Sequence, residues 1–432
     1  MESRIRAAGT GLGSCQTQPC RRIVSFAMST SATLGQTTRT RLPSSAAKRE
    51  GMGIWRFVTL VAATLMGVIT GWAYLTRRGH GVDWSAIYNA AQTWREGGQP
   101  YVVGDSFFNP PPTLLLLRPF LLLTFDQAYA VWTVINVAIL LICTAALALA
   151  GGWRWDGRQA AAGAWLCLFF TPSVLLVPVT GNLSGLVLAS YALGIWWLRQ
   201  GKDGRAGAAF ALGLCKPQLV FLVLPLLLYK GRWRAAGSYC VTSLVAVGVS
   251  LPFTGLATYR AYLSIQQWIA NSTQDNAALQ LDAPGIHAML LQQWPGSFWS
   301  TFAATILSLM VVAALAWYWR GEWQPESSRF LDGWSLLVAA TILVVPYAHS
   351  YDLVLLILVI VTLFMKRERH AVNCLLASST LLLLYAAPFA VLVYRQHFVV
   401  PVLLCACALL WHEASTSSHG TGPIAPQSIQ PP

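Results

Sequence analysis

Apolar stretches of about 20 residues recur between residues 54 and 411, and they constrain the fold of this chain more than any other feature. A helix of that length reaches about 30 Å, which matches the hydrocarbon core of a bilayer. Only 10% of the 432 residues are charged, whereas a typical soluble domain has about 25%. We therefore predict an all-α fold, a polytopic bundle of transmembrane helices, and exclude a soluble domain, a disordered chain and a disulfide scaffold.

The positive charge is spread along the chain rather than gathered in one patch. The formal net charge is +13, but the 29 Lys and Arg residues lie in short clusters between the apolar runs. This distribution is typical of loops that fix membrane orientation, and it argues against a nucleic-acid surface. Most of the 9 Cys residues lie inside apolar segments, where Cys packs as a small hydrophobe, so we expect neither a disulfide framework nor a zinc site.

Two polar tails flank the apolar region. Residues 1–53 are rich in Ser, Thr, Gly and Arg and show no helical periodicity. We interpret them as a disordered cytoplasmic tail, or as an over-extended start with the true start near Met28 or Met52; an organelle transit peptide is the alternative. Residues 54–411 form the predicted membrane domain, and residues 412–432 are expected to be a disordered C-terminal tail.

Hydropathy and the basic loops together predict about twelve membrane helices with both termini in the cytoplasm. The continuous spans are 54–75, 127–150, 159–178, 184–198, 235–253, 299–319, 332–347, 351–365, 371–388 and 397–411. Residues 113–124 are too short to span, and we expect a re-entrant or surface-lying helix there. The stretch 206–229 must be a hairpin with Lys216 at its tip if all basic loops are to lie on one side. The segments 76–112 and 254–298 are then the two long outward loops.

Asp83 lies in the first outward loop and opens an amphipathic segment that continues to Glu96. Its apolar residues recur at helical spacing: Trp84, Ile87, Tyr88, Ala91 and Trp94. We place Asp83 at the N-cap of this helix. In one interpretation the carboxylate only caps the helix. In the other it is a general base that takes a proton from an acceptor hydroxyl.

Lys216 and His349 are the candidate cations. Lys216 interrupts an apolar stretch, and intramembrane charges mark functional sites by default, although a Lys that snorkels to the interface is the alternative. His349 lies in a polar run between two apolar stretches. It is either a satisfied core residue or a group that contacts a phosphate or orients Asp83, with Asp352 as its candidate partner.

Several further polar and aromatic residues are expected to line a pocket beside Asp83. They are Trp84, Tyr88, Tyr101, Asn109, Asn182, Gln218, Tyr351 and Asp352. The sequence contains neither a phosphate-binding loop motif nor a dinucleotide fingerprint. If the chain transfers a sugar, a donor carried by polyprenyl phosphate would reach an outward-facing site without such a motif.

The order of short motifs along the chain resembles glycosyltransferase family 87. The motifs are Asp83, Tyr88-Asn89-Ala90-Ala91, Gly97-Gly98-Gln99-Pro100-Tyr101, Phe108-Asn109-Pro110-Pro111, Ala130-Val131-Trp132 with Asn136, Gly181-Asn182, Lys216-Pro217, Gly231-Arg232-Trp233-Arg234 and His349-Ser350-Tyr351. Members are multispanning GT-C enzymes similar to bacterial polyprenol-phosphate-mannose-dependent mannosyltransferases. The chain departs from the family pattern at Asn109, where an aromatic residue is frequent, and at Asn182, where Gln is frequent.

The resemblance implies a hexosyltransferase of the plasma membrane. It would move a hexose, mannose first, or an arabinofuranose from polyprenyl phosphate to an extracytoplasmic glycolipid or glycan, with inversion. Asp83 would be the base, Lys216 and His349 would bind the donor phosphate, and no metal or other cofactor is expected. A transporter or flippase of a lipid-linked substrate is the main alternative, but only one broken stretch is visible where transporters often have a pair. A non-catalytic assembly subunit is the third.

Overall fold

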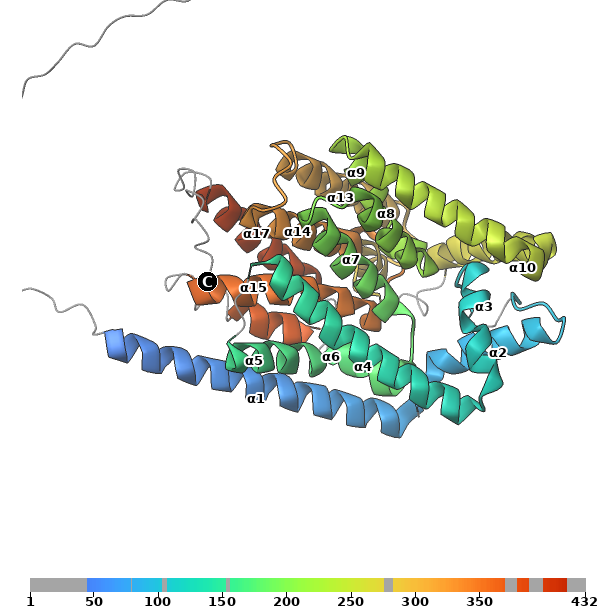
Figure 1. Ribbon diagram of the computed structural model, residues 1–432, viewed down its shortest axis with the longest axis horizontal. Coiled ribbons are helices and arrows are strands. Elements are labelled where there is room, and N and C mark those ends of the chain that lie inside the picture. Colours follow the sequence, from blue (N-terminus) through green and yellow to red (C-terminus); the bar gives the residue numbers. More distant parts are fainter. Residues whose placement is uncertain are drawn as a thin grey trace, which may run out of the picture. The chain divides into compact units, whose positions relative to one another are not determined.

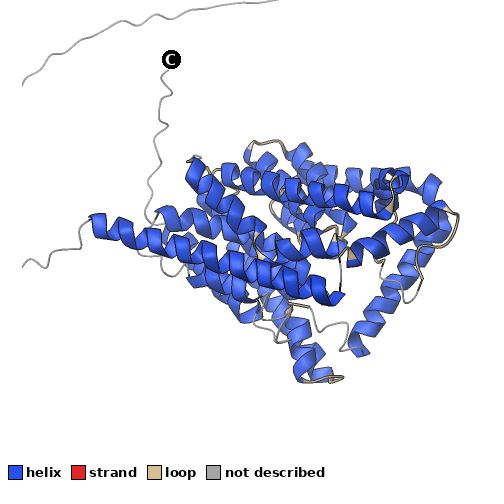
Figure 2. Ribbon diagram, turned by 90° about the horizontal axis from the view of Figure 1, so that it is seen from below, coloured by secondary structure: helices blue, strands red, loops and turns tan. Residues whose placement is uncertain are grey.

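The computed structural model describes residues 45–78, 80–102, 107–152, 156–275, 283–369, 379–387 and 399–417, and these residues form helices and loops without a strand (Figures 1 and 2). The all-α prediction is therefore confirmed. The chain divides into two units, Met1–Arg49 and Glu50–Pro432, and the helices named below belong to the second, apart from the first turn of α1. Most of the two predicted tails lies outside the described residues. Helix α1 (Ser45–Arg78) begins inside the predicted tail 1–53, and α17 (Val399–Ser417) ends inside the predicted tail 412–432.

Most predicted spans correspond to helices, several of them broken. The remaining elements are α2 (Val82–Arg95), α3 (Pro112–Leu117), η1 (Arg118–Leu122), α4 (Phe125–Ala150), α5 (Gly157–Leu168), α6 (Thr171–Val174), the π-helical turn η2 (Leu175–Thr180), α7 (Ser184–Arg199), α8 (Asp203–Ala211), η3 (Leu212–Cys215), η4 (Pro217–Leu219), α9 (Val223–Tyr229), α10 (Trp233–Asp275), α12 (Ile286–Gln293), α13 (Phe298–Tyr318), α14 (Ser328–Val344), η5 (Ser350–Leu356) and α15 (Ile357–Arg369).

Among the described residues, three helices are long and apolar enough to cross a bilayer, namely α4, residues 233–269 of α10, and α13. Helices α5 and α6 would add a fourth crossing if the pair, bent by 64°, is one span. The other apolar helices are shorter, including Pro112–Leu122 and Ser350–Met365. The total of about twelve membrane helices therefore stays a prediction.

The core is built on α14, which is buried on every face from Phe330 to Leu343. Helices α13, α15 and α17 pack against it. The Trp334 ring stacks on Phe210 of α8 with centroids 5.0 Å apart, and Tyr191 of α7 meets Trp334 edge-on. Burial of such large aromatic side chains contributes most to packing, because each removes about 150–250 Å² from solvent. Helices α4, α7, α8 and α10 then pack in succession.

Three basic turns, at residues 199–205, 230–234 and 319–329, lie together at one end of α7. Arg199 donates to the Glu326 carbonyl at 3.0 Å, and Lys230 donates to the Trp319 carbonyl at 2.9 Å. Arg232 forms an ion pair with Asp203 at 2.6 Å, so the two ends of the segment 203–232 meet. Lys216, between these ends in sequence, bonds instead to Ser184 at the other end of the 16-residue α7, about 24 Å away. This is the geometry expected of a hairpin.

The expectation of a long loop at 254–298 is wrong over residues 254–275 and again over α12, Ile286–Gln293. Helix α10 continues to Asp275 and only changes direction at Gly255, whose φ of 77° is accessible to glycine at little cost. Beyond this kink Ala261, Ile265 and Trp268 recur at helical spacing and pack into the cluster around α2 and α3. Gln and Asn are tolerated in such a helix, so their abundance did not indicate a loop.

Candidate active site

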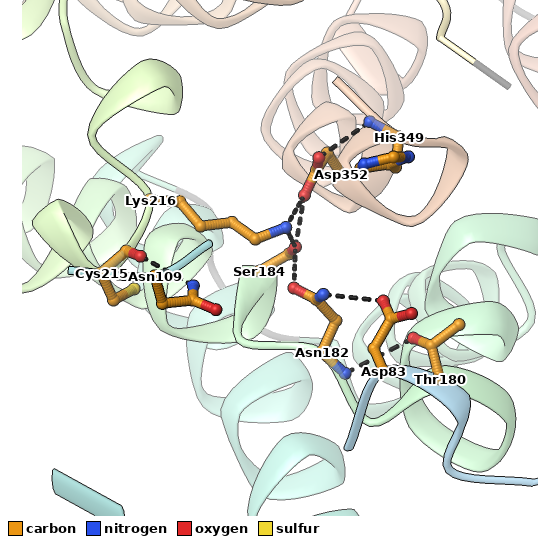
Figure 3. A network of polar contacts seen from close by, with 9 residues as sticks. All are labelled: Asp83, Asn109, Thr180, Asn182, Ser184, Cys215, Lys216, His349 and Asp352. Atoms are coloured by element: carbon orange, nitrogen blue, oxygen red, sulfur yellow. Dashed lines mark hydrogen bonds and ion pairs between the residues drawn. The ribbon is translucent and has the colours of Figure 1, made fainter. Parts of the chain in front are cut away.

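A continuous chain of hydrogen bonds joins Asp83 to Asp352 at the N-terminal end of α7 (Figure 3). Asn182 Nδ2 donates to Asp83 Oδ2 at 2.8 Å. Ser184 Oγ lies 3.0 Å from Asn182 Oδ1 and 2.5 Å from Asp352 Oδ1. Lys216 Nζ donates to Ser184 Oγ at 3.1 Å and to Asp352 Oδ1 at 2.7 Å. Residues from four distant parts of the sequence therefore share one polar network.

Asp83 is presented by the first turn of α2, not by its N-cap as the sequence predicted. The N-cap is Gly81, with φ 67° and ψ 29°, a left-handed conformation that Asp adopts only occasionally. The Gly81 amide donates to the Val179 carbonyl at 2.6 Å and so fixes the start of α2 beside η2. The half-buried Asp83 carboxylate is turned to Asn182, and no side-chain cap bond is made at this helix start.

Asn182 owes its position to the tight turn between η2 and α7. Gly181 has φ 67°, and a Cβ there would lie 2.8 Å from the Tyr129 ring and 2.9 Å from Trp84 Cβ. The Gly181 carbonyl accepts from Trp132 Nε1 at 2.8 Å. The turn therefore packs against the side chains of Trp84, Tyr129 and Trp132, which we call the aromatic floor. The buried Asn182 amide is directed at Asp83.

Trp84 belongs to this floor. Its side chain is fully buried, and its ring stacks on Trp132 with centroids 5.4 Å apart. Tyr88, one turn further along α2, donates its hydroxyl to the Leu123 carbonyl at 2.8 Å. Both residues were predicted to line the pocket, and in the structure both contribute to packing beneath Asp83.

Tyr101 and Asn109 connect the first outward segment to the backbone beside Lys216. Tyr101 donates its hydroxyl to the Asn109 carbonyl at 2.6 Å, and Asn109 Nδ2 donates to the Cys215 carbonyl at 2.9 Å. Burial, more than the nearby Tyr262, raises the pKa of the Tyr101 phenol far above its usual value, so this hydroxyl stays a donor. These two predicted lining residues thus support the loop that carries Lys216.

Lys216 lies at a break between two short 3₁₀ helices, η3 and η4, where Pro217 disfavours helical backbone at the residue before it. Its ammonium group is buried, with 7% of the side chain exposed, and Asp352 beside it is fully buried. The Lys216 Nζ atom also lies 4.6 Å above the Tyr351 ring. Gln218, two residues on in η4, is half buried.

His349 is the N-cap residue of η5. Its backbone amide donates to Asp352 Oδ2 at 2.9 Å, and its half-buried imidazole stacks on Tyr351 with centroids 5.2 Å apart. The predicted pairing of His349 with Asp352 is therefore made through the backbone, and the ion-pair partner of Asp352 is Lys216. Among the described residues, no three His, Cys, Asp or Glu side chains form a group that could hold a metal ion.

Sequence reasoning missed Ser184, which bonds to both halves of the network. The available signal was weak, because a Ser at the start of an apolar helix is common as a capping residue. What distinguishes Ser184 is its three-dimensional position between Asn182 and the Lys216–Asp352 pair.

Comparisons with known proteins point in one direction. The sequence profile described as glycosyltransferase family 87 matches residues 107–346, more than half of the chain. An α-(1→3)-arabinofuranosyltransferase from two strains of Mycobacterium tuberculosis is 29% identical over 200 residues, which cover 44% of this chain and 46% of that protein. The matched part is thus about half the length of these curated relatives. No solved structure matches.

Proposed function

The chain belongs to glycosyltransferase family 87 and is a membrane glycosyltransferase, and from this premise we propose that it moves a sugar from a polyprenyl-phosphate donor to a hydroxyl of a glycolipid or glycan. The observation that carries the proposal is the network that links a half-buried carboxylate, Asp83, to a buried cation, Lys216. Transfer from a phosphate donor requires both a proton acceptor and a group that stabilises the departing phosphate.

Asp83 is the base in this proposal. Asn182 donates to Asp83 Oδ2, and Oδ1 is the oxygen that we assign to the acceptor hydroxyl. The acceptor oxygen attacks the anomeric carbon while the bond from that carbon to the phosphate oxygen breaks. The hydroxyl proton passes to Asp83, the electron pair of the broken bond leaves with the polyprenyl phosphate, and the anomeric configuration inverts.

Lys216 and His349 are assigned to the phosphate. An ammonium group has three hydrogens, and those of Lys216 reach Asp352 Oδ1 and Ser184 Oγ, so we assign the third to the donor. Because Asp352 and Ser184 already fix the Lys216 side chain, it would need little reorganisation when charge develops on the leaving oxygen. The half-buried His349 ring, stacked on Tyr351, is the second contact.

The donor sugar in this proposal is arabinofuranose or mannose. The printed name of the relatives supports arabinofuranose, because they are called arabinofuranosyltransferases. Mannose is the hexose that the motif order of the sequence favours. We place the protein in the plasma membrane with both termini in the cytoplasm. The basic turns at the far end of α7 would then face the cytoplasm, and the network would face outward.

The test is turnover of the purified full-length chain in lipid nanodiscs with a panel of polyprenyl-phosphate sugars, scored by mass detection of released polyprenyl phosphate. Asp83→Asn is expected to abolish release. Asp126→Asn is the matched control, since Asp126 also lies in the first turn of a helix, α4, but is exposed. Equal loss in both variants, or normal turnover by Asp83→Asn, would remove Asp83 from the mechanism. A flippase would move the donor without releasing polyprenyl phosphate.

A further inference from the structure

Ser184 has more hydrogen-bond neighbours than its single hydrogen can serve. Its Oγ lies 2.5 Å from Asp352 Oδ1, 3.0 Å from Asn182 Oδ1 and 3.1 Å from Lys216 Nζ (Figure 3). A hydroxyl group has one hydrogen to donate and two lone pairs to accept with, whereas an ammonium group only donates. Lys216 therefore takes one lone pair of Ser184, and two acceptor oxygens face its one hydrogen.

The protonation state of Asp83 decides which acceptor receives that hydrogen. When Asp83 is ionised, Asn182 donates to it through Nδ2, so Asn182 Oδ1 faces Ser184 and needs the hydroxyl hydrogen. Asp352 Oδ1 is then satisfied by Lys216. Every acceptor then has a donor, but no hydrogen lies between Ser184 Oγ and Asp352 Oδ1, so their 2.5 Å contact must lengthen in this pattern.

A second complete pattern exists when Asp83 carries a proton. The Asp83 carboxyl group then turns so that its protonated oxygen faces Asn182 and donates to Asn182 Oδ1, which also requires the Asn182 amide to rotate by 180°. Rotation brings Nδ2 of Asn182 opposite Ser184 Oγ, since the two ends of an amide are nearly equal in size. Ser184 accepts from Asn182 and Lys216 and turns its hydrogen to Asp352. Because buried polar groups without partners are costly, the network favours one complete pattern over mixed ones.

We propose that Ser184 is a positioning residue that couples the proton on Asp83 to the Lys216–Asp352 ion pair. The inference rests on the proposed function, and adds that base and phosphate site act together. When Asp83 takes the acceptor proton, Ser184 turns to Asp352 and stabilises that carboxylate without Lys216. The Lys216 ammonium is then held less tightly by Asp352 and interacts more strongly with the departing phosphate. No atom other than the acceptor proton changes its owner.

Among the described side chains on the elements that pack against α2, no charged group is hydrogen-bonded to Asp83. Helix α2 packs against α3, η1, η2 and α4. Besides Asp83, the titratable or charged groups on α2, on the described residues flanking it and on these elements are His80, Tyr88, Arg95, Glu96, Arg118, Asp126, Tyr129 and Cys143. Arg95 and Tyr88 bond to backbone carbonyls of Leu121 and Leu123, and the Arg118 guanidinium lies 5.9 Å from the Phe253 ring centroid. Coupling through Asn182 and Ser184 is therefore the shortest route shown by hydrogen bonds.

The experiment measures binding of a polyprenyl monophosphate, the proposed leaving group, by calorimetry in nanodiscs. The amide of Asp83→Asn permits both hydrogen-bond patterns, whereas an ionised Asp permits only the first. Asp83→Asn should therefore bind the probe about tenfold more tightly than the wild type, about 1.4 kcal/mol. In a Ser184→Ala background the same change should gain less than about threefold, which is the direct effect of removing one negative charge.

Further variants test this comparison of Asp83→Asn in the wild-type and Ser184→Ala backgrounds. Ser184→Thr retains the hydroxyl and should restore the tenfold gain. If Ser184→Ala does not fold, Ser184→Cys takes its place, because a thiol is similar in size to a hydroxyl but is only a weak donor. Ser190→Ala is the control, because Ser190 Oγ donates to the Val187 carbonyl of its own helix at 2.7 Å. An equal gain in the wild-type and Ser184→Ala backgrounds overturns the coupling alone. Absence of probe binding to the wild type overturns the proposed donor class, and with it the coupling.

Discussion

The buried Lys216–Asp352 pair makes a prediction that separates stability from activity. Lys216→Met should lower the free energy of unfolding by about 3–5 kcal/mol, because it leaves the fully buried Asp352 carboxylate without its cation. We expect the lower end of this range, about 3 kcal/mol, since the His349 amide still donates to Asp352 and the Ser184 hydroxyl beside it can turn to Asp352 once Lys216 is removed.

Removing both charges should reverse most of this loss. In Lys216→Met/Asp352→Leu no unpaired charge remains, and replacement of a buried ion pair by apolar side chains is often neutral or stabilising. The His349 amide loses its acceptor, whereas Ser184 keeps Asn182, so we expect the double variant within about 2 kcal/mol of the wild type. Sugar transfer should stay absent, because the proposed phosphate contact is missing.

The assay is reversible unfolding in mixed micelles, followed by tryptophan fluorescence, with turnover measured on the same samples. Arg232→Ala is the control, since it breaks an ion pair with Asp203 that is partly exposed and should cost less than about 1 kcal/mol. If Lys216→Met costs no more than Arg232→Ala, the ion pair is not buried as described. If the double variant is active, Lys216 is not the phosphate contact.

Three further outcomes can be measured. Lys216→Ala should raise KM for the donor more than KM for the acceptor, because the proposed contact is with the donor phosphate; the opposite ranking would contradict it. Gly181→Ala should lower the free energy of unfolding by about 2–4 kcal/mol, because the backbone φ is positive and the added methyl group would clash with the aromatic floor. Gly152→Ala is its control: φ is also positive but the space is open, so the cost should be only about 1–2 kcal/mol. Asn109→Ala should raise KM for the donor and lower the free energy of unfolding by about 1–3 kcal/mol, because it leaves the Cys215 carbonyl without its donor; an unchanged KM would separate Asn109 from the site.

The sequence predicted long apolar helices well because their signal is local. The span expected at 127–150 is α4, Phe125–Ala150, and the span expected at 184–198 is α7, Ser184–Arg199. Polar helices and helix starts were harder. The first half of 254–298 is helical because packing of residues such as Ile265 outweighs its polar composition, and α2 begins at Val82, ahead of Asp83, because Gly81 adopts a left-handed conformation.

The sequence identified most residues of the candidate site, but it did not show which of them contact one another. Lys216 stands out because charges inside apolar stretches are costly, Asp83 because it opens an amphipathic segment after the first span, and Asp352 only as the candidate partner of His349. Lys216 and Asp352, however, are 136 positions apart, and nothing local indicates that they meet. The sequence also suggested His349 as the partner of Asp352, and the structure shows that only its backbone amide takes that part. Ser184 becomes notable only after folding brings both groups to it.

The Lys216–Asp352 pair looks at first like an obstacle to phosphate binding, since the cation is already neutralised. The geometry argues the opposite. A Lys exposed to water would be strongly hydrated and would have to shed that water and lose side-chain freedom as the phosphate departs. Lys216 has already been desolvated and fixed on folding, at 7% exposure, by Asp352 and Ser184. In the proposed mechanism the reaction would then have to supply only a shift of the ammonium between two anions, and the proton arriving on Asp83 would bias that shift toward the leaving phosphate as its charge develops.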